Sequence, residues 1–365
     1  MLDLCFQKPY NPPCNSTFVY SYSSGITGLR RNISDRLAFA FTLLACAISV
    51  NTWQGVMAST GRPPIARSPV NSAAAEGTNE STVAPQSGDE IWFVSARSIN
   101  VDTTDLSQLK VQVFGKSGWE SSSLSQLLES HASEATDETV LYVHGNRTDE
   151  YHAKCRGRQV FRNLFANWPS PRPSIRFVIW AWNSDKLGHG TSDFCIKSRR
   201  AVKLGSIFSA TVSAFDPSDP PLIIGYSLGS QVIAQAFIGN SLPLKKTRYR
   251  LALIAPVLDC RFSCLSIESR HSDESIAQTV VLFNQKDIVT SLARRICERQ
   301  SGIHFQPFEK WVQSPTLPLG SVQQIDITAT SSCQHSITKY SSEGRVKQSI
   351  RDLLLQKSNT SKELE

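Results

Sequence analysis

A serine in the middle of the chain has the surroundings of a nucleophile. Ser227 lies in Gly225-Tyr-Ser-Leu-Gly229, between a short apolar run at 222–224 and a segment of helical spacing at 228–238. A strand, a sharp turn and a helix in this order lift a serine hydroxyl above a sheet, and the flanking glycines let the backbones pass closely. The start of the helix also directs backbone N–H groups at the reaction centre. The sequence therefore predicts nucleophilic chemistry at Ser227.

A serine hydroxyl is a weak nucleophile at neutral pH and needs a base within hydrogen-bond reach. The histidines downstream of Ser227 are His271, His304 and His335. His335 follows the last predicted strand, in a loop just before a helix, from which it can reach back over the sheet. We therefore predict that His335 is the base, with His304 and then His271 as alternatives in more polar segments.

The base in turn needs an acid that orients it, and on a strand–turn–helix site the acid precedes the histidine in the chain. Asp287 ends a predicted apolar strand and is expected at the same edge of the sheet as Ser227. Asp259 follows the preceding strand and is the alternative, although an aspartate there also suits a turn or a helix cap. We predict Asp287.

The oxyanion of an acyl-transfer intermediate is expected to accept hydrogen bonds from two backbone N–H groups. One is that of Leu228, directly after the nucleophile. The other belongs to the segment His144-Gly145-Asn146 after an early strand, where the N–H of Asn146 is the predicted donor. His144 itself is interpreted as a core histidine under the site and not as an acid or base.

Strands alternate with helices along the rest of the chain, which favours an α/β fold: a mainly parallel sheet with helices on both faces. The first two strands lack a long crossover and are expected to form an antiparallel N-terminal edge. The predicted strands are 91–94, 109–114, 139–143, 175–180, 222–224, 248–257, 279–284 and 322–328, and the predicted helices are 123–130, 150–168, 197–215, 228–238 and 345–355. Ligands bind such sheets at the carboxyl ends of the strands, where these site residues would lie.

Composition and charge exclude some other classes. The net charge of +7 is modest, and its densest basic stretches, 197–200 and 245–250, are not interleaved with aromatic residues as a nucleic-acid groove requires. Cys260-x-x-x-Cys264 lacks the second pair of ligands that a structural zinc site needs. We therefore predict no nucleic-acid partner, no metal and no cofactor.

The N-terminal region has the layout of a secretory leader. Basic residues at 30–36 precede an apolar core at 37–50, within a disordered leader that spans 1–58. Cleavage after Ala47, a lipid on Cys46, a twin-arginine signal at Arg30-Arg31 and an uncleaved anchor over 37–58 all remain open. The sequence predicts an exported protein of the periplasm or cell envelope, with possible membrane association through 37–58.

The remaining boundaries follow from composition. Residues 59–89 contain almost no large apolar side chain and are predicted to be a disordered linker, because they cannot bury enough surface to offset their ordering entropy. The folded domain is expected at 90–357, with a charged tail at 358–365. An exported domain can hold an even number of cysteines as disulfides, here as three pairs, drawn from Cys155, Cys195, Cys260, Cys264, Cys297 and Cys333.

With these motifs in place, residues 90–355 resemble the α/β-hydrolase superfamily. Val143-His-Gly145, the Ser227 turn, Asp287 and His335 occur in its expected order. Within the superfamily the chain is most similar to a bacterial family of unknown function, through 180–184, 255–259 and 281–295. Such families show Trp-Pro-Ser where this chain has Trp182-Asn-Ser184, which is expected to alter one wall of the pocket, and they often carry His-Ser-Met-Gly where this chain reads Tyr226-Ser-Leu-Gly229.

The resemblance implies a serine hydrolase that acts on a small-molecule or lipid ester through an acyl-enzyme. Two alternatives stay open at this point: an amidase or peptidase on the same residues, and a catalytically silent binding protein of the same fold. Segments 183–196 and 300–320 are candidates for an apolar lid and equally for plain surface loops.

Overall fold

The computed structural model describes residues 88–102, 105–133, 136–187, 191–238, 249–258, 276–293, 321–330 and 335–356. All of them belong to one compact unit, Asn79–Glu365. The predicted leader, the linker up to residue 87 and the charged tail lie outside the described residues, so their boundaries stay predictions.

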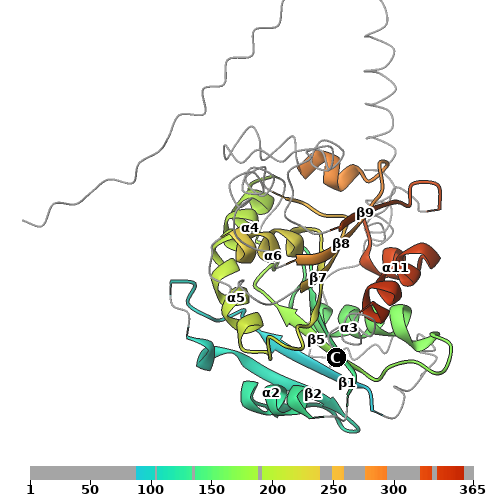
Figure 1. Cartoon of the computed structure of the whole chain (residues 1–365). Helices are drawn as coiled ribbons and strands as arrows, with labels where there is room; N and C mark the ends of the chain where they lie inside the picture. The colour runs from blue at the N-terminus through green and yellow to red at the C-terminus, as the bar shows by residue number, and fades with distance from the viewer. Residues whose placement is uncertain are drawn as a thin grey trace, which may run out of the picture. The chain divides into compact units, whose positions relative to one another are not determined.

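A nine-stranded sheet forms the centre of this unit, in the order β3-β2-β1-β5-β4-β6-β7-β8-β9 (Figure 1). Strand β1 pairs with β5 in parallel, and every pairing from there to β9 is parallel as well. Strands β1, β2 and β3 pair antiparallel. The predicted α/β class with a mainly parallel sheet and an antiparallel N-terminal edge is therefore confirmed. The strands are β1 Glu90–Ser95, β2 Lys110–Gly115, β3 Gly118–Ser122, β4 Glu138–Val143, β5 Ile175–Ala181, β6 Leu222–Tyr226, β7 Tyr249–Ile254, β8 Ile276–Phe283 and β9 Ser321–Asp326.

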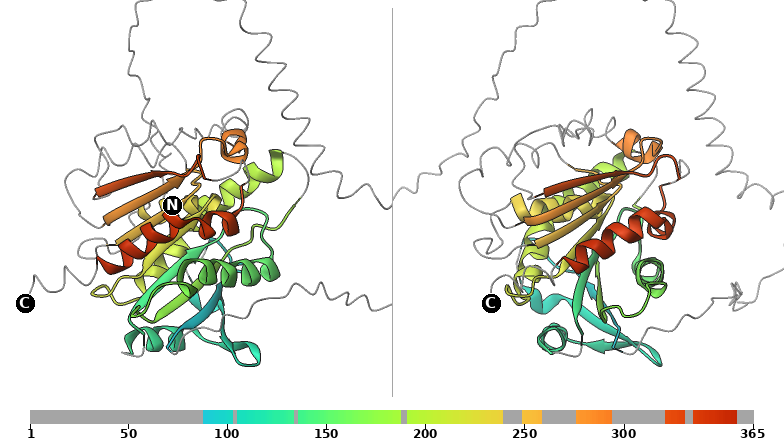
Figure 2. Two further views of the ribbon diagram at one scale, coloured as in Figure 1. Left: turned by 90° about the vertical axis from the view of Figure 1, so that its right-hand side faces the viewer. Right: turned by 45° about the vertical axis from the view of Figure 1, so that its right-hand side comes forward.

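Helices cover both faces of the sheet, as predicted (Figure 2). One face packs against α2 (Leu124–Ala132), α4 (Thr191–Lys203), α5 (Gly205–Ser213) and α6 (Leu228–Ile238). The other packs against α3 (Glu150–Phe161), the short helical turn η2 (Arg162–Ala166), α10 (Ile337–Ser342) and α11 (Gly344–Leu355).

The central strands are buried on both faces, which explains their continuous apolar sequence. In β4, Leu141 and Val143 face the first group of helices, whereas Val140 and Tyr142 face the second. This alternation follows from the two-residue period of a strand. Each central strand therefore holds both helix layers in place, and the loops at its ends are fixed by the packing of the core.

The sheet order creates a crevice between β4 and β6. These two strands are neighbours, but the chain leaves β4 towards β5 on one side and leaves β6 towards β7 on the other. Ligands of open parallel sheets bind where adjacent connections diverge in this way, at the carboxyl ends of the strands. The Ser227 turn follows β6 and the His144-Gly145-Asn146 segment follows β4, so both flank this crevice.

Two predictions about the elements were wrong. Strand β3 was missed, because its sequence, Gly-Trp-Glu-Ser-Ser, is mostly polar and lies half exposed at the edge of the sheet. The single helix predicted at 197–215 is instead two helices: α4 begins at residue 191, and α5 begins at Gly205. A side chain at Gly205 would lie 2.6 Å from the side chain of Gln235, so the break coincides with a close approach of α5 to α6.

The early start of α4 has an electrostatic reason. Asp193 and Lys197 are one helical turn apart and form a fully buried ion pair, 2.8 Å between Lys197 Nζ and Asp193 Oδ1. Because these charged residues lie on the buried face of α4, the apolar spacing that would predict a helix is interrupted, and the start of the helix was not predicted. The segment 183–196 is thus in part a packed helix and not a surface loop.

Candidate active site

Ser227 occupies a strained turn between β6 and α6. Its φ is +52°, in the left-handed region of backbone conformation. Any residue other than glycine is strained there, which costs free energy. The turn is held from both sides: Ser227 N donates to the carbonyl of Ile254 at 3.0 Å, and Val257 N donates to the carbonyl of Ser227 at 3.3 Å. Strain of this kind persists only where the surroundings fix it, and here it places the hydroxyl at the carboxyl edge of the sheet.

Glycines on both sides allow the segment that follows β4, residues 144–149 (the β4 loop), to approach the serine. A methyl group at Gly229 would lie 2.3 Å from the carbonyl oxygen of Val143. A methyl group at Gly145 would lie 2.8 Å from the ring of Tyr226 and 3.0 Å from the Cβ of Ser227. Gly225 lies in β6 and faces Ile233 of α6. These close contacts bring the predicted oxyanion loop against the predicted nucleophile.

Ser227, His335 and Asp287 form one continuous line of hydrogen bonds. The Oγ of Ser227 lies 2.9 Å from Nε2 of His335, and Nδ1 of His335 lies 2.6 Å from Oδ2 of Asp287. Since the carboxylate only accepts, Nδ1 carries the proton and donates to Asp287. Nε2 is then unprotonated in the neutral imidazole and accepts from the serine hydroxyl. The three residues come from positions up to 108 apart in the chain.

Asp287 is buried and held by several donors. The backbone N–H groups of Val289 and Thr290 donate to its Oδ1 at 3.0 and 3.2 Å, because Asp287 caps the helical residues 288–293. Burial alone would raise the pKa of this carboxyl, but hydrogen bonds and the charge of His335, together with the hydrogen bond from Tyr340, outweigh burial and lower the pKa below its usual value. Asp287 is therefore ionised at neutral pH.

Two tyrosines that the sequence reading missed complete this line. The hydroxyl of Tyr340 in α10 donates to Oδ2 of Asp287 at 2.9 Å, and burial and the neighbouring carboxylate raise the pKa of Tyr340. The ring of Tyr226 stacks on the imidazole of His335, with 5.1 Å between the ring centroids. Tyr226 directly precedes Ser227 and Tyr340 lies five residues after His335, so their proximity in sequence was the available signal.

The β4 loop follows a path that suits an oxyanion hole. Leu228 is the first residue of α6, and the N–H groups of a first helical turn have no partner within the helix. Asn146 lines the pocket beside Ser227, and its side-chain oxygen accepts from the N–H of Arg147 at 2.8 Å. Arg147 has a φ of +53°, so the chain turns sharply directly after Asn146. These positions are consistent with backbone donation from Leu228 and Asn146.

His144 has a structural environment. Its Nε2 accepts from the backbone N–H of Trp182 at 3.1 Å, so Nδ1 carries the proton and donates to the carbonyl of Gly145 at 2.9 Å. Trp182 Nε1 donates to the carbonyl of His144 at 2.7 Å. Burial lowers the pKa of His144 to about 4, so the ring is neutral at pH 7. Both of its nitrogens are used to fix the backbone under the site.

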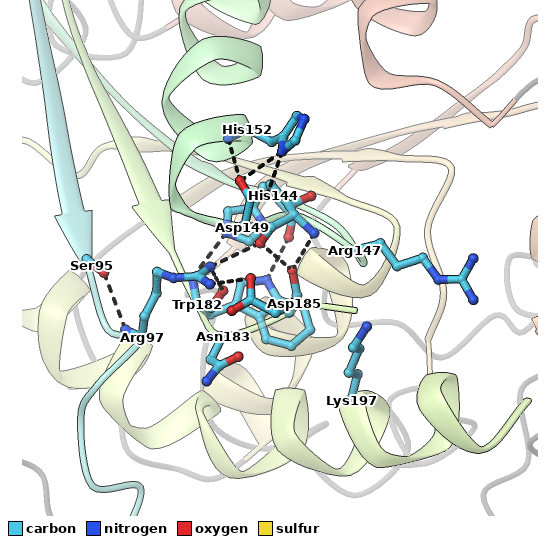
Figure 3. Close-up of polar contacts among 12 residues, drawn as sticks. Ser95, Arg97, His144, Arg147, Asp149, His152, Trp182, Asn183, Asp185 and Lys197 are labelled. Carbon is cyan, nitrogen blue, oxygen red and sulfur yellow. Dashed lines mark hydrogen bonds and ion pairs between the residues drawn. The ribbon is translucent and has the colours of Figure 1, made fainter. Parts of the chain in front are cut away.

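A polar network behind His144 braces the same loop (Figure 3). Nη1 of Arg97, which follows β1, donates to the carbonyls of Thr148 and Trp182, each at 3.0 Å, and its Nη2 bonds to Asp185. Ser184 Oγ accepts from Thr148 N at 3.1 Å and contacts the carbonyl of Gly145 at 3.0 Å. The ends of β1, β4 and β5 are thereby tied together. Sequence reasoning missed Arg97, because its partners are 51 to 88 residues away.

A pocket of about 670 Å³ opens over Ser227 and His335. Its apolar lining includes Phe194, Val289, Leu292 and Ile337, and its polar lining includes Asn146, Arg147, Arg156 and Thr338. Phe194 comes from α4, so the segment proposed as a lid contributes part of the wall. Trp182, Asn183 and Ser184 do not line the pocket, so the predicted change of one wall at these residues was wrong. Trp182 and Ser184 brace the β4 loop, and the carbonyl of Asn183 accepts from Arg200.

Several alternatives from the sequence lie outside the described residues: Asp259, His271, His304, the Cys260–Cys264 pair and segment 300–320. Cys155 is a free thiol, which contradicts a pairing of all six cysteines in three disulfides; it lies on α3, whose described neighbours offer it no second thiol.

Across the described ranges, no group of three His, Cys, Asp or Glu is placed to hold a metal ion. None of the helices described is long and apolar enough to cross a membrane.

The sequence matches no protein-family model, and no curated protein matches it at a significant level. The geometry and chemistry of the site therefore carry the functional argument.

Proposed function

We propose that this protein is a serine hydrolase of the α/β-hydrolase type that cleaves carboxylic esters through an acyl-enzyme on Ser227. The observation that carries the proposal is the line from Ser227 Oγ through His335 to Asp287, with separations of 2.9 and 2.6 Å, on a serine with left-handed backbone. The parallel sheet, the strand–turn–helix around Ser227 and the chain order Ser, Asp, His support the assignment to this fold.

The reaction follows from the protonation states of this line. As Ser227 Oγ attacks the ester carbonyl, its proton passes to Nε2 of His335, and the ionised Asp287 stabilises the imidazolium. The oxyanion is stabilised by the N–H groups of Leu228 and Asn146. His335 then gives its proton to the departing alcohol, which leaves the acyl group on Ser227. A water molecule, deprotonated by His335, attacks this acyl-enzyme, and Ser227 recovers its proton as the acid is released.

The same line provides no role for a metal or a cofactor, because the serine supplies the nucleophile and the histidine moves the proton. The acyl group occupies the pocket over Ser227, whose apolar side chains suit an aliphatic chain. The predicted export of the protein remains an expectation from residues 1–58.

Pre-steady-state hydrolysis of 4-nitrophenyl acetate and 4-nitrophenyl butyrate tests the proposal. The wild type is expected to release a burst of nitrophenolate stoichiometric with enzyme, and Ser227→Ala is expected to release none. Ser230→Ala is the matched control, because it removes a buried hydroxyl in the first turn of α6 that has no hydrogen-bond partner within the described structure. Equal release by the wild type and Ser227→Ala would contradict the proposal.

A further inference from the structure

The pocket over Ser227 has an uneven distribution of charge. Among its described lining residues are two arginines, Arg147 from the β4 loop and Arg156 from α3, and none of these described residues is an aspartate or glutamate. Asp287 does not line the pocket: its buried carboxylate lies behind His335, on the Nδ1 side of the ring. Two arginines without a carboxylate among the described lining residues favour anionic ligands, because a cleft whose charges have one sign concentrates ligands of the opposite sign.

The charge of Arg147 is only partly compensated. Its Nε contacts Oδ2 of Asp193 at 3.2 Å, but the same carboxylate also binds Nζ of the buried Lys197 at 2.8 Å. Asp193 additionally accepts from the backbone N–H of Leu187 at 2.9 Å. One carboxylate thus serves two cations, and this group retains a net positive charge beside the pocket. Arg147 and Lys197 lie on the same side of the His144 network in Figure 3.

Arg156 has no such compensation. It is exposed on α3, and within the described ranges no carboxylate pairs with it. Its positive charge nevertheless acts on groups beneath the pocket. It lowers the pKa of Tyr226, against the larger effect of burial, and it adds to the larger effect of burial in lowering the pKa of His144. A guanidinium in this position has all five N–H donors available to a ligand, and its planar fork matches a carboxylate or a phosphate.

Resting on the hydrolase function proposed above, we infer that the preferred substrate is an anionic ester, with Arg156 as the residue that selects its negative group. The apolar side chains Phe194, Val289 and Ile337 line the same pocket and suit an aliphatic stretch between this negative group and the scissile carbonyl. Arg147 adds to the attraction, but Arg156 is the cation with free donors.

Two matched fluorophosphonates test this inference: one with an aliphatic chain that ends in a carboxylate, and one in which an isopropyl group of similar size replaces the carboxylate. The rate of covalent labelling at Ser227 is measured for each, so the readout requires no knowledge of the natural ester. The wild type is expected to react roughly tenfold faster with the anionic probe, as one well-placed ion pair provides. High salt is expected to reduce this preference.

Arg156→Gln is expected to remove most of the preference for the anionic probe, and Arg156→Lys is expected to retain part of it. Arg199→Gln is the matched control: Arg199 is an exposed arginine on α4 that does not line the pocket, and its loss changes the net charge equally. A wild type that prefers the neutral probe, or a preference that Arg156→Gln leaves unchanged, would overturn the inference alone. A wild type that neither probe labels would overturn the hydrolase function and the inference with it.

Discussion

Two histidines lie at the carboxyl edge of the same sheet, and their surroundings differ in one decisive respect. His335 places Nδ1 on the carboxylate of Asp287 and Nε2 on the hydroxyl of Ser227. His144 places Nδ1 on the carbonyl of Gly145 and receives the N–H of Trp182 at Nε2. Both rings have the same tautomer, and both are held by two hydrogen bonds.

The difference between the two rings is how well their surroundings stabilise the protonated imidazolium. At His335 a neighbouring carboxylate stabilises the imidazolium, and the group at Nε2 is one that can give up its proton. At His144 a proton on Nε2 would displace the N–H of Trp182 inside the core, where burial already disfavours the charge. The partners of a histidine, and not its position over the sheet, thus separate the proposed base, His335, from the structural residue His144.

The largest effect is expected from His335→Ala. Removal of the proposed base is expected to lower kcat/KM for 4-nitrophenyl butyrate on the order of 10⁴- to 10⁶-fold. Loss of a catalytic-triad residue has an effect of this size in serine hydrolases. Steady-state kinetics with active-site titration measures this. A loss of less than about tenfold would assign the base to another residue.

Asp287→Asn is expected to have the next largest effect, a loss of about 10⁴-fold in kcat, because an amide at this position favours the wrong tautomer of His335. The variant is expected to stay folded, since the side-chain oxygen can still cap residues 288–293. Circular dichroism provides the control for folding. Near-normal turnover would show that Asp287 does not orient the base.

Tyr340→Phe sharpens the account of Asp287 by removing one donor to its carboxylate without changing shape. A hydrogen bond to a charged group contributes about 1.5–3 kcal/mol, and only part of this is lost when other donors remain. We therefore expect a decrease in kcat of roughly tenfold. An effect as large as that of Asp287→Asn would indicate that Tyr340 acts on the reaction directly.

His144→Gln tests the other histidine, through stability and not turnover. The pKa of His144 is lowered to about 4 in the folded protein, below the ordinary value of 6.5, so the unfolded chain binds a proton that the native state does not bind between these values. The native stability that His144 supports is therefore present above pH 6.5 and is lost as pH falls towards 4. Between pH 7 and pH 5 this loss amounts to about 2 kcal/mol.

Urea denaturation at pH 7 and pH 5 measures this contribution. His144→Gln is expected to unfold more easily at pH 7 but to lose less stability on acidification than the wild type, because glutamine does not titrate. Equal pH dependence in both proteins would contradict the structural interpretation of His144.

Sequence reasoning predicted the parts of this site whose signals are local. Ser227, Asp287 and His335 each follow a recognisable strand, and strands of a parallel sheet bring their carboxyl ends to one edge. Arg97, Arg156 and Tyr340 were missed, because their roles depend on partners fixed only by tertiary packing: Arg97 contacts Asp185 across 88 residues. Strand β3 and the start of α4 were missed for a related reason, since polar residues on their faces are paired in the fold and obscure the apolar period.

Covalent labelling with a neutral alkyl fluorophosphonate tests the central claim most directly, followed by mass spectrometry of the labelled peptide. The account predicts that the wild type is labelled at Ser227 and that His335→Ala is not, whereas His144→Gln is labelled within about tenfold of the wild-type rate, the loss of one neutral hydrogen bond. Labelling that survives in His335→Ala at the wild-type rate, or that is lost equally in His144→Gln, would contradict it.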